Sequence, residues 1–174
     1  MCIRDRIKTV RGFTPKFGTN CFIAENAVVL GDVEIGNDCS VWFSAVVRGD
    51  VNSIRVGNNV NIQDGAVIHC TFERSQTYIG DNVSIGHNAI VHGCTIKENV
   101  LVGMGSIVMD NAIVESNVLI AAGAVVLENA KLESGYIYAG VPAKKVKPLT
   151  EEAFKDSVGR IAGAYKKYAS WFKE

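Results

Sequence analysis

The chain has 174 residues, which is enough for one domain with its own hydrophobic core. Its 18 basic and 18 acidic residues cancel and give no indication of a nucleic-acid partner, while its apolar runs stay far below the ~20 residues that span a bilayer. The five cysteines are an odd number without the spacing of a disulfide scaffold, so they predict reduced thiols and a cytoplasmic protein.

The first six residues, MCIRDR, do not continue into the pattern that follows them. Their back-translation resembles an adapter used in sequencing libraries, and we predict that residues 1–6 are a non-native leader. The rest of the chain divides into a repeat over residues 7–147 and a helical pattern over residues 148–174.

A short motif recurs along the repeat: an aliphatic or aromatic residue, often Gly, then small polar residues and Val or Cys. It starts at seven positions, with intervals of 18, 21, 23, 17, 18 and 18 residues: Phe17, Ile35, Val56, Ile79, Ile96, Val114 and Leu132. Aliphatic residues fall about six apart, which predicts three short strands per coil with Gly, Asn and Asp at the corners. A β-sandwich would show longer alternating strands, and a Rossmann-like fold would need helices between strands. The pattern predicts a mainly β protein, a triangular parallel β-helix of about seven coils.

A C-terminal α-helix is predicted from Thr150 onward. Thr150 can cap the helix, and Glu151 and Glu152 are favourable in its first turn. Apolar residues then recur at helical spacing: Phe154, Val158, Ile161, Tyr165, Tyr168 and Phe172. We expect this helix to pack along one face of the prism or on a neighbouring chain.

Two of the three histidines fall in one column of the predicted prism. One face has the inward positions Val29, Val47, Ile68, Val91, Val108 and Val126, and the residue after each is exposed: Leu30, Arg48, His69, His92, Met109 and Leu127. His69 and His92 therefore occupy the same place on consecutive coils, which lie ~4.8 Å apart. Imidazoles at that spacing can lean onto one metal ion, because Zn–N bonds are about 2.0–2.1 Å long.

The third histidine, His87, belongs to the preceding face and lies near a corner. Side chains from two faces of a prism diverge, so His87 should not reach an ion held by His69 and His92 of its own chain. A neighbouring chain could supply it, and three prisms side by side would close as a ring. Polar residues on the same face, one coil earlier, could orient the groups bound at that junction: Asn61, Gln63 and Asp64.

Both insertions in the repeat fall at the corner leaving the face of the histidine column. The turn with three surplus residues contains Gly49, Asp50 and Asn52, and the turn with five surplus residues contains residues 72–77. Excursions on one side of a repeat array often mark its functional side. Simpler interpretations stay open: a single surface histidine usually has no function, and the charged residues of this region are either solvated or paired between chains. Cys70 as a fourth ligand would indicate a structural metal.

These residues resemble the γ-class carbonic anhydrase family. The matching stretches are VVRGDVNSIRVGNNVNIQDGAVIHC, IGDNVSIGHNAIVHGC and YAGVPAKKVKPLT, and the likeness covers nearly all of residues 8–174. The resemblance implies a left-handed β-helix and a homotrimer with a metal ion at each subunit junction. It implies that His69 and His92 of one chain and His87 of the next are the ligands.

The resemblance also implies roles for the polar residues around the ion. Gln63 and Asn61 match residues that orient bound solvent and substrate, and Tyr165 matches a tyrosine of the terminal helix. Residues matching those that bridge subunits are Arg48, Asp50 and Asp64. Three neutral imidazoles leave the full charge of the ion acting on bound water, whose pKa can fall to about 7, and this water would convert carbon dioxide to bicarbonate. Imidazoles suit Zn²⁺, and equally Fe²⁺ or Co²⁺.

The sequence departs from the family at the position of the residue that would carry the released proton away from the site. Val51 stands where the archetypal enzyme has a glutamate, and Glu73 is the one candidate replacement in a shortened loop. Two other functions therefore stay open: an acyltransferase on the same scaffold with a histidine as general base, and a non-catalytic trimeric assembly protein whose metal joins the subunits.

Overall fold

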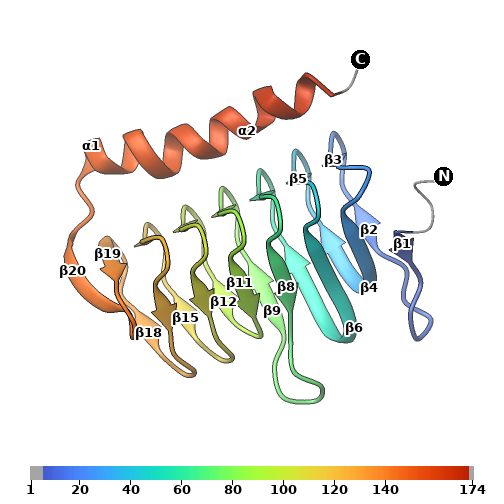
Figure 1. Ribbon diagram of the computed structural model, residues 1–174, viewed down its shortest axis with the longest axis horizontal. Helices are drawn as coiled ribbons and strands as arrows, with labels where there is room; N and C mark the ends of the chain where they lie inside the picture. Colours follow the sequence, from blue (N-terminus) through green and yellow to red (C-terminus); the bar gives the residue numbers. More distant parts are fainter. Residues whose placement is uncertain (1–5, 173–174) are drawn as a thin grey trace.

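The strands of the computed structural model wind into a parallel β-solenoid of about seven turns, flanked by one C-terminal helix (Figure 1). The predicted β-helix and terminal helix are thereby confirmed. The structure describes residues 6–172, so residues 1–5 of the expected leader lie outside it. The strands are β1 (Ile7–Lys8), β2 (Lys16–Phe17), β3 (Phe22–Ile23), β4 (Val28–Ile35), β5 (Ser40–Val41), β6 (Val46–Val56), β7 (Asn61–Ile62), β8 (Val67–His69), β9 (Thr77–Ile79), β10 (Ser84–Ile85), β11 (Ile90–His92), β12 (Thr95–Ile96), β13 (Leu101–Val102), β14 (Ile107–Val108), β15 (Ile113–Val114), β16 (Leu119–Ile120), β17 (Val125–Val126), β18 (Lys131–Leu132), β19 (Tyr136–Ala139) and β20 (Lys144–Pro148).

The strands form three faces. What we call the histidine face carries β1, the first halves of β4 and β6, and then β8, β11, β14 and β17. The second face carries β2, the other halves of β4 and β6, and then β9, β12, β15 and β18. The helix face carries β3, β5, β7, β10, β13, β16 and β19, and antiparallel β20 closes its end. Each long strand, β4 and β6, turns one corner without a break.

The repeat positions pair in the register that the sequence predicts. Parallel pairing joins each to the next along the series Phe17, Ile35, Val56, Ile79, Ile96, Val114 and Leu132. The three-residue insertion is a bulge in β6 between Gly49 and Ile54. The five-residue insertion lies in the loop between β8 and β9, which projects from the solenoid in Figure 1. Both lie at the corner between the histidine face and the second face, as predicted.

The inside of the solenoid is filled by small and aliphatic side chains. Ile68 and Ile85 have no exposed surface, and neither does Val91. Cys70 is equally buried, and burial raises the pKa of its thiol to about 11. No disulfide joins the four cysteines within the described residues. Cys70 therefore packs in the core, which argues against its binding a metal beside the histidines.

The C-terminal helix covers the helix face of its own chain and runs back toward the first coils (Figure 1). It consists of α1 (Glu151–Phe154), a π-helical turn (Lys155–Gly159) and α2 (Arg160–Ser170). Ala162 and Ala169 are buried, and the Tyr165 ring packs edge-on to Trp42 with the centroids 5.2 Å apart. The sequence left open whether this helix packs on its own prism or on a neighbouring chain, and the structure shows it packed on its own chain. Along the described chain, the helices are too short and too polar to cross a membrane.

Thr150 caps this helix as predicted, and its removal should be measurable. Its Oγ1 accepts a hydrogen bond from the backbone N–H of Ala153 at 3.2 Å. Thr150→Ala should lower the free energy of unfolding by about 1 kcal/mol, because that N–H loses its partner. Thr150→Ser keeps the hydroxyl and should stay within about 0.5 kcal/mol of the wild type. Urea unfolding at fixed protein concentration measures both, and equal stability of the two variants would contradict the capping role.

Candidate metal centre

His69 and His92 lie side by side on the histidine face. They occupy paired positions of β8 and β11, so the register predicted for them is confirmed. Their ring centroids are 5.2 Å apart with the planes inclined at 62°. His69 Nδ1 lies 3.2 Å from His92 Nε2. One nitrogen of each ring thus points at the same small volume between them.

The other nitrogen of each ring contacts an aspartate. His69 Nε2 lies 3.0 Å from Asp50 Oδ1, and His92 Nδ1 lies 2.7 Å from Asp110 Oδ2. Burial alone would raise the pKa of both carboxyls, but hydrogen bonds from neighbouring side chains outweigh it and hold both pKa values below the ordinary one. Burial, assisted by the charge of Arg48, lowers the pKa of His69. An ionised aspartate accepts the N–H of a neutral imidazole, which leaves a lone pair on the facing nitrogen.

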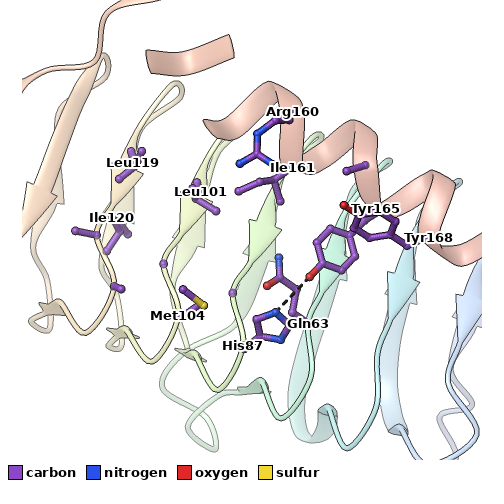
Figure 2. Close-up of a pocket in the computed structure, with 15 residues that line it drawn as sticks. Gln63, His87, Leu101, Met104, Leu119, Ile120, Arg160, Ile161, Tyr165 and Tyr168 are labelled. Carbon is purple, nitrogen blue, oxygen red and sulfur yellow. Dashed lines mark hydrogen bonds between the residues drawn. The ribbon is translucent and has the colours of Figure 1, made fainter. Parts of the chain in front are cut away.

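His87 lies on the helix face, two residues after the end of β10. Its Nδ1 is 3.0 Å from Asp64 Oδ2, and its Nε2 is 3.4 Å from the hydroxyl of Tyr165 on α2, a contact marked by the dashed line in Figure 2. His87 thus repeats the arrangement of the other two histidines. In the part of the chain that the structure describes, no group of three His, Cys, Asp or Glu side chains is placed to hold one ion. A centre that used all three histidines would need two chains.

Asn61 and Gln63 form a fixed chain of amides beside His87. Both are buried, with 2% and 4% of their surface exposed. Gln63 Nε2 donates to Asn61 Oδ1 at 2.9 Å, and Asn61 Nδ2 donates to Ser84 Oγ at 2.8 Å. These bonds set the orientation of both amides, so the carbonyl oxygen of Gln63 is left as an acceptor.

A pocket of about 380 Å³ lies between the helix and the helix face (Figure 2). Gln63, His87 and Tyr165 form one polar end, and Arg160 and Tyr168 also line the pocket. Most of the remaining lining is apolar: Leu101, Met104, Leu119, Ile120 and Ile161. Burial and, to a smaller extent, the charge of Asp64 raise the pKa of Tyr165 to about 12. Tyr165 therefore keeps its proton at neutral pH and can donate a hydrogen bond.

The charged residues expected to bridge subunits lie on two different faces. Arg48 forms an ion pair with Asp50, and its guanidinium lies 3.4 Å from His69 Nδ1. Asp64 instead contacts His87. Arg48 and Asp64 are not paired within this chain, so a contact between them would need a second chain.

The two positions considered for proton export, Val51 and Glu73, do not contact the histidines. Val51 is half-buried and packs against the core. Glu73 is exposed in the loop between β8 and β9. Neither supplies an acid or base at the centre within one chain.

Three residues of this centre escaped the sequence analysis: Asp110, and with it Thr71 and Ser75, whose hydroxyls hydrogen-bond to it. Asp110 follows Met109, which occupies the column position one coil after His92. A search of the next rung for a carboxylate partner of each histidine would have predicted it. The loop contacts carry no such signal, because they depend on how the five-residue insertion folds.

Comparison with known proteins identifies relatives of nearly the whole chain. Protein YrdA of Escherichia coli (strain K12) is 44% identical over 85% of this chain and 84% of its own. A carbonic anhydrase of Geobacillus kaustophilus (strain HTA426) is 40% identical over 94% of this chain and 88% of its own. Gamma carbonic anhydrase 2, mitochondrial, of Arabidopsis thaliana is 42% identical over 80% of this chain and 52% of its own.

Solved structures share the fold. A hexapeptide transferase family protein from Anaplasma phagocytophilum superposes with a TM-score of 0.92 at 40% identity, over 97% of this chain and 99% of its own. The S84C mutant of AntD, an N-acyltransferase from Bacillus cereus solved with coenzyme A and a nucleotide sugar, has a TM-score of 0.61 over 88% of this chain and 92% of its own. At 19% identity, that likeness shows the fold alone.

The family assignment rests on the repeat and on the relatives together. The bacterial transferase hexapeptide (six repeats) model matches residues 14–49 and 93–128, which are coils of the solenoid. The relatives named carbonic anhydrase match across the histidine region as well as the repeat. The chain therefore belongs to the γ-class carbonic anhydrase family of hexapeptide-repeat proteins.

Proposed function

We propose that the protein converts carbon dioxide and water to bicarbonate and a proton, reversibly, at a metal centre shared between subunits of a homotrimer. The observation that carries this proposal concerns all three histidines. Each has one ring nitrogen against an aspartate carboxylate, and the other directed away from it. A carboxylate behind the imidazole is the usual support of a metal-binding histidine, because it sets the tautomer and strengthens the ligand.

The donor set fits a divalent ion. His69 Nδ1 and His92 Nε2 are 3.2 Å apart, and two nitrogens bound to one tetrahedral zinc at 2.0–2.1 Å lie about 3.3 Å apart. Two lone pairs that face each other at this distance favour a cation between them. His69, His92 and the His87 of a neighbouring subunit would hold the ion, with Zn²⁺, Fe²⁺ and Co²⁺ as candidates. When bound, the ion would supply water activated at neutral pH, since zinc lowers the pKa of its water to about 7.

The histidine face favours a homotrimer. The outward residue before each inward position is aliphatic: Val28, Val46, Val67, Ile90, Ile107 and Val125. No element of the described chain covers this ladder. Ile90 on it is 37% exposed, and Leu127, in the neighbouring column of the histidines, is 50% exposed. An apolar ladder beside the metal ligands is typical of a subunit interface. Three copies could close a ring that brings His87 of one chain to His69 and His92 of the next.

The polar groups of the helix face have roles in handling water and substrate in this proposal. Gln63 accepts a hydrogen bond from water through its carbonyl oxygen, because Asn61 already accepts from its amide nitrogen. Tyr165, protonated at neutral pH, donates to an oxygen of the substrate. Arg48 pairs with Asp64 across the interface, and Asp50 keeps the Arg48 guanidinium in place.

One sample purified without oxygen tests the proposal, through elemental analysis and a stopped-flow assay of carbon dioxide hydration. We expect about one divalent ion per chain and hydration well above the buffer rate. His92→Ala should lose both, because a ligand is removed, whereas Lys131→Ala on the second face should lose neither. A metal-free wild type with full acyltransferase activity would contradict the proposal. Metal-loaded protein that hydrates no faster than buffer would instead indicate an ion that only joins subunits.

A further inference from the structure

The loop between β8 and β9 reaches the metal centre through one carboxylate. Thr71 Oγ1 donates a hydrogen bond to Asp110 Oδ1 at 2.9 Å, and Ser75 Oγ donates to the same oxygen. The other oxygen, Oδ2, lies 2.7 Å from His92 Nδ1. One carboxylate oxygen of Asp110 is thus held by the loop, and the other faces His92.

This arrangement has little freedom to move. Ser75 is 5% exposed, and its carbonyl accepts a hydrogen bond from Asn52 Nδ2 at 2.9 Å. Gly93 lies against the cluster with φ of +57°, and a Cβ there would collide with Ser75 Oγ and Asp110 Oδ1. The Asp110 side chain is 15% exposed. The loop, the carboxylate and the backbone after His92 are therefore packed as one unit.

We infer that Asp110, tethered by Thr71 and Ser75, is a positioning residue that keeps His92 in its metal-binding tautomer. The two hydroxyls donate to Oδ1, so Oδ2 is free to accept the His92 Nδ1 proton. The lone pair then lies on Nε2, the nitrogen that faces His69 at 3.2 Å. The inference rests on the proposed function for the identity of the bound group. It also assigns the loop that contains the five-residue insertion a role in holding Asp110 against His92.

Asp110→Asn should reverse this tautomer without changing the shape of the site. Thr71 and Ser75 would still donate to the amide oxygen, which directs the amide NH₂ toward His92 Nδ1. Nδ1 must then accept, so the proton moves to Nε2 and the lone pair facing His69 is lost. Asp81→Asn is the matched control, because Asp81 Oδ1 also accepts a hydrogen bond, from the backbone N–H of Asn58 at 2.7 Å, but contacts no histidine.

Two measurements separate positioning from general stability. In metal-free protein, ¹⁵N shifts of the histidine ring nitrogens should report protonated Nδ1 for His92 in the wild type and in Asp81→Asn, and protonated Nε2 in Asp110→Asn. Competition with a chromophoric chelator should show about 10–100-fold weaker Zn²⁺ binding for Asp110→Asn than for the wild type. Wild-type tautomer and wild-type affinity in Asp110→Asn would overturn the inference.

A second variant covers the case in which Asp110→Asn does not fold. Thr71→Val with Ser75→Ala keeps the carboxylate but removes its tether, so His92 should retain its tautomer while Zn²⁺ binding weakens by less than about tenfold. Unchanged binding in this double variant would overturn the role of the loop. The failure of the proposed function is distinguishable, because a wild type that binds no metal or hydrates no carbon dioxide leaves the tautomer measurement intact.

Discussion

Mixed trimers of His69→Ala and His87→Ala chains should hold about one third of the metal of the wild type, although each variant alone holds none. His69 and His87 lie on different faces of the solenoid, and in the proposed ring they belong to opposite sides of one junction. A junction is complete when a chain with intact His69 meets a chain with intact His87. Every trimer that contains both kinds of chain has one such junction among its three.

Two affinity tags make this experiment decisive. Co-expressed variants carrying different tags and purified over both supports contain mixed trimers only, and elemental analysis and the hydration assay are then run on the same material. The matched control combines His69→Ala with His92→Ala, which remove ligands from the same side of the junction, so no junction can be complete. Recovery in that control, or none in the His69→Ala and His87→Ala pair, would contradict a centre shared between chains.

The periodicity of the sequence was sufficient to predict the fold and the register of the histidines. In a solenoid each coil pairs with its neighbours along the chain, so counting residues between equivalent positions predicts which side chains stack. The 23-residue interval from Val56 to Ile79 is the clearest example, because allowing for its insertion brings His92 beside His69. A fold with long-range strand order would not have allowed this inference.

The hydrogen bonds that hold the histidine partners could not be predicted in the same way. Asp110 lies in the regular repeat, one rung after His92, but its tether comes from Thr71 and Ser75 on a loop whose path follows no period. The resemblance assigned Asp64 to a contact with Arg48 of another chain, whereas within one chain its partner is His87. The period places the backbone, but side-chain pairing also depends on the corners, the loop and the terminal helix.

Ile68→Ala should lower the free energy of unfolding by about 2–5 kcal/mol and disturb the metal centre at the same time. Ile68 is fully buried, directly before His69 on β8, and its rung lies between those of Val47 and Val91. Truncation leaves a cavity that the stacked coils cannot close, because each strand is hydrogen-bonded to both neighbours. Urea unfolding at one fixed protein concentration measures the loss, since assembly would otherwise change the apparent stability.

The matched control is Ile113→Ala, which removes the same atoms from an outward position of β15 on the second face. Its cost should stay below about 1 kcal/mol, because that side chain already borders solvent. Ile68→Ala should also weaken Zn²⁺ binding, whereas Ile113→Ala should not. Of the two residues, only Ile68 lies next to a proposed metal ligand, His69, on the same strand. Equal losses of stability in the two variants would mean that the core does not hold the ligand strands in place. A large loss of stability with unchanged metal affinity would mean that the tethers to Asp50 and Asp110 suffice without it.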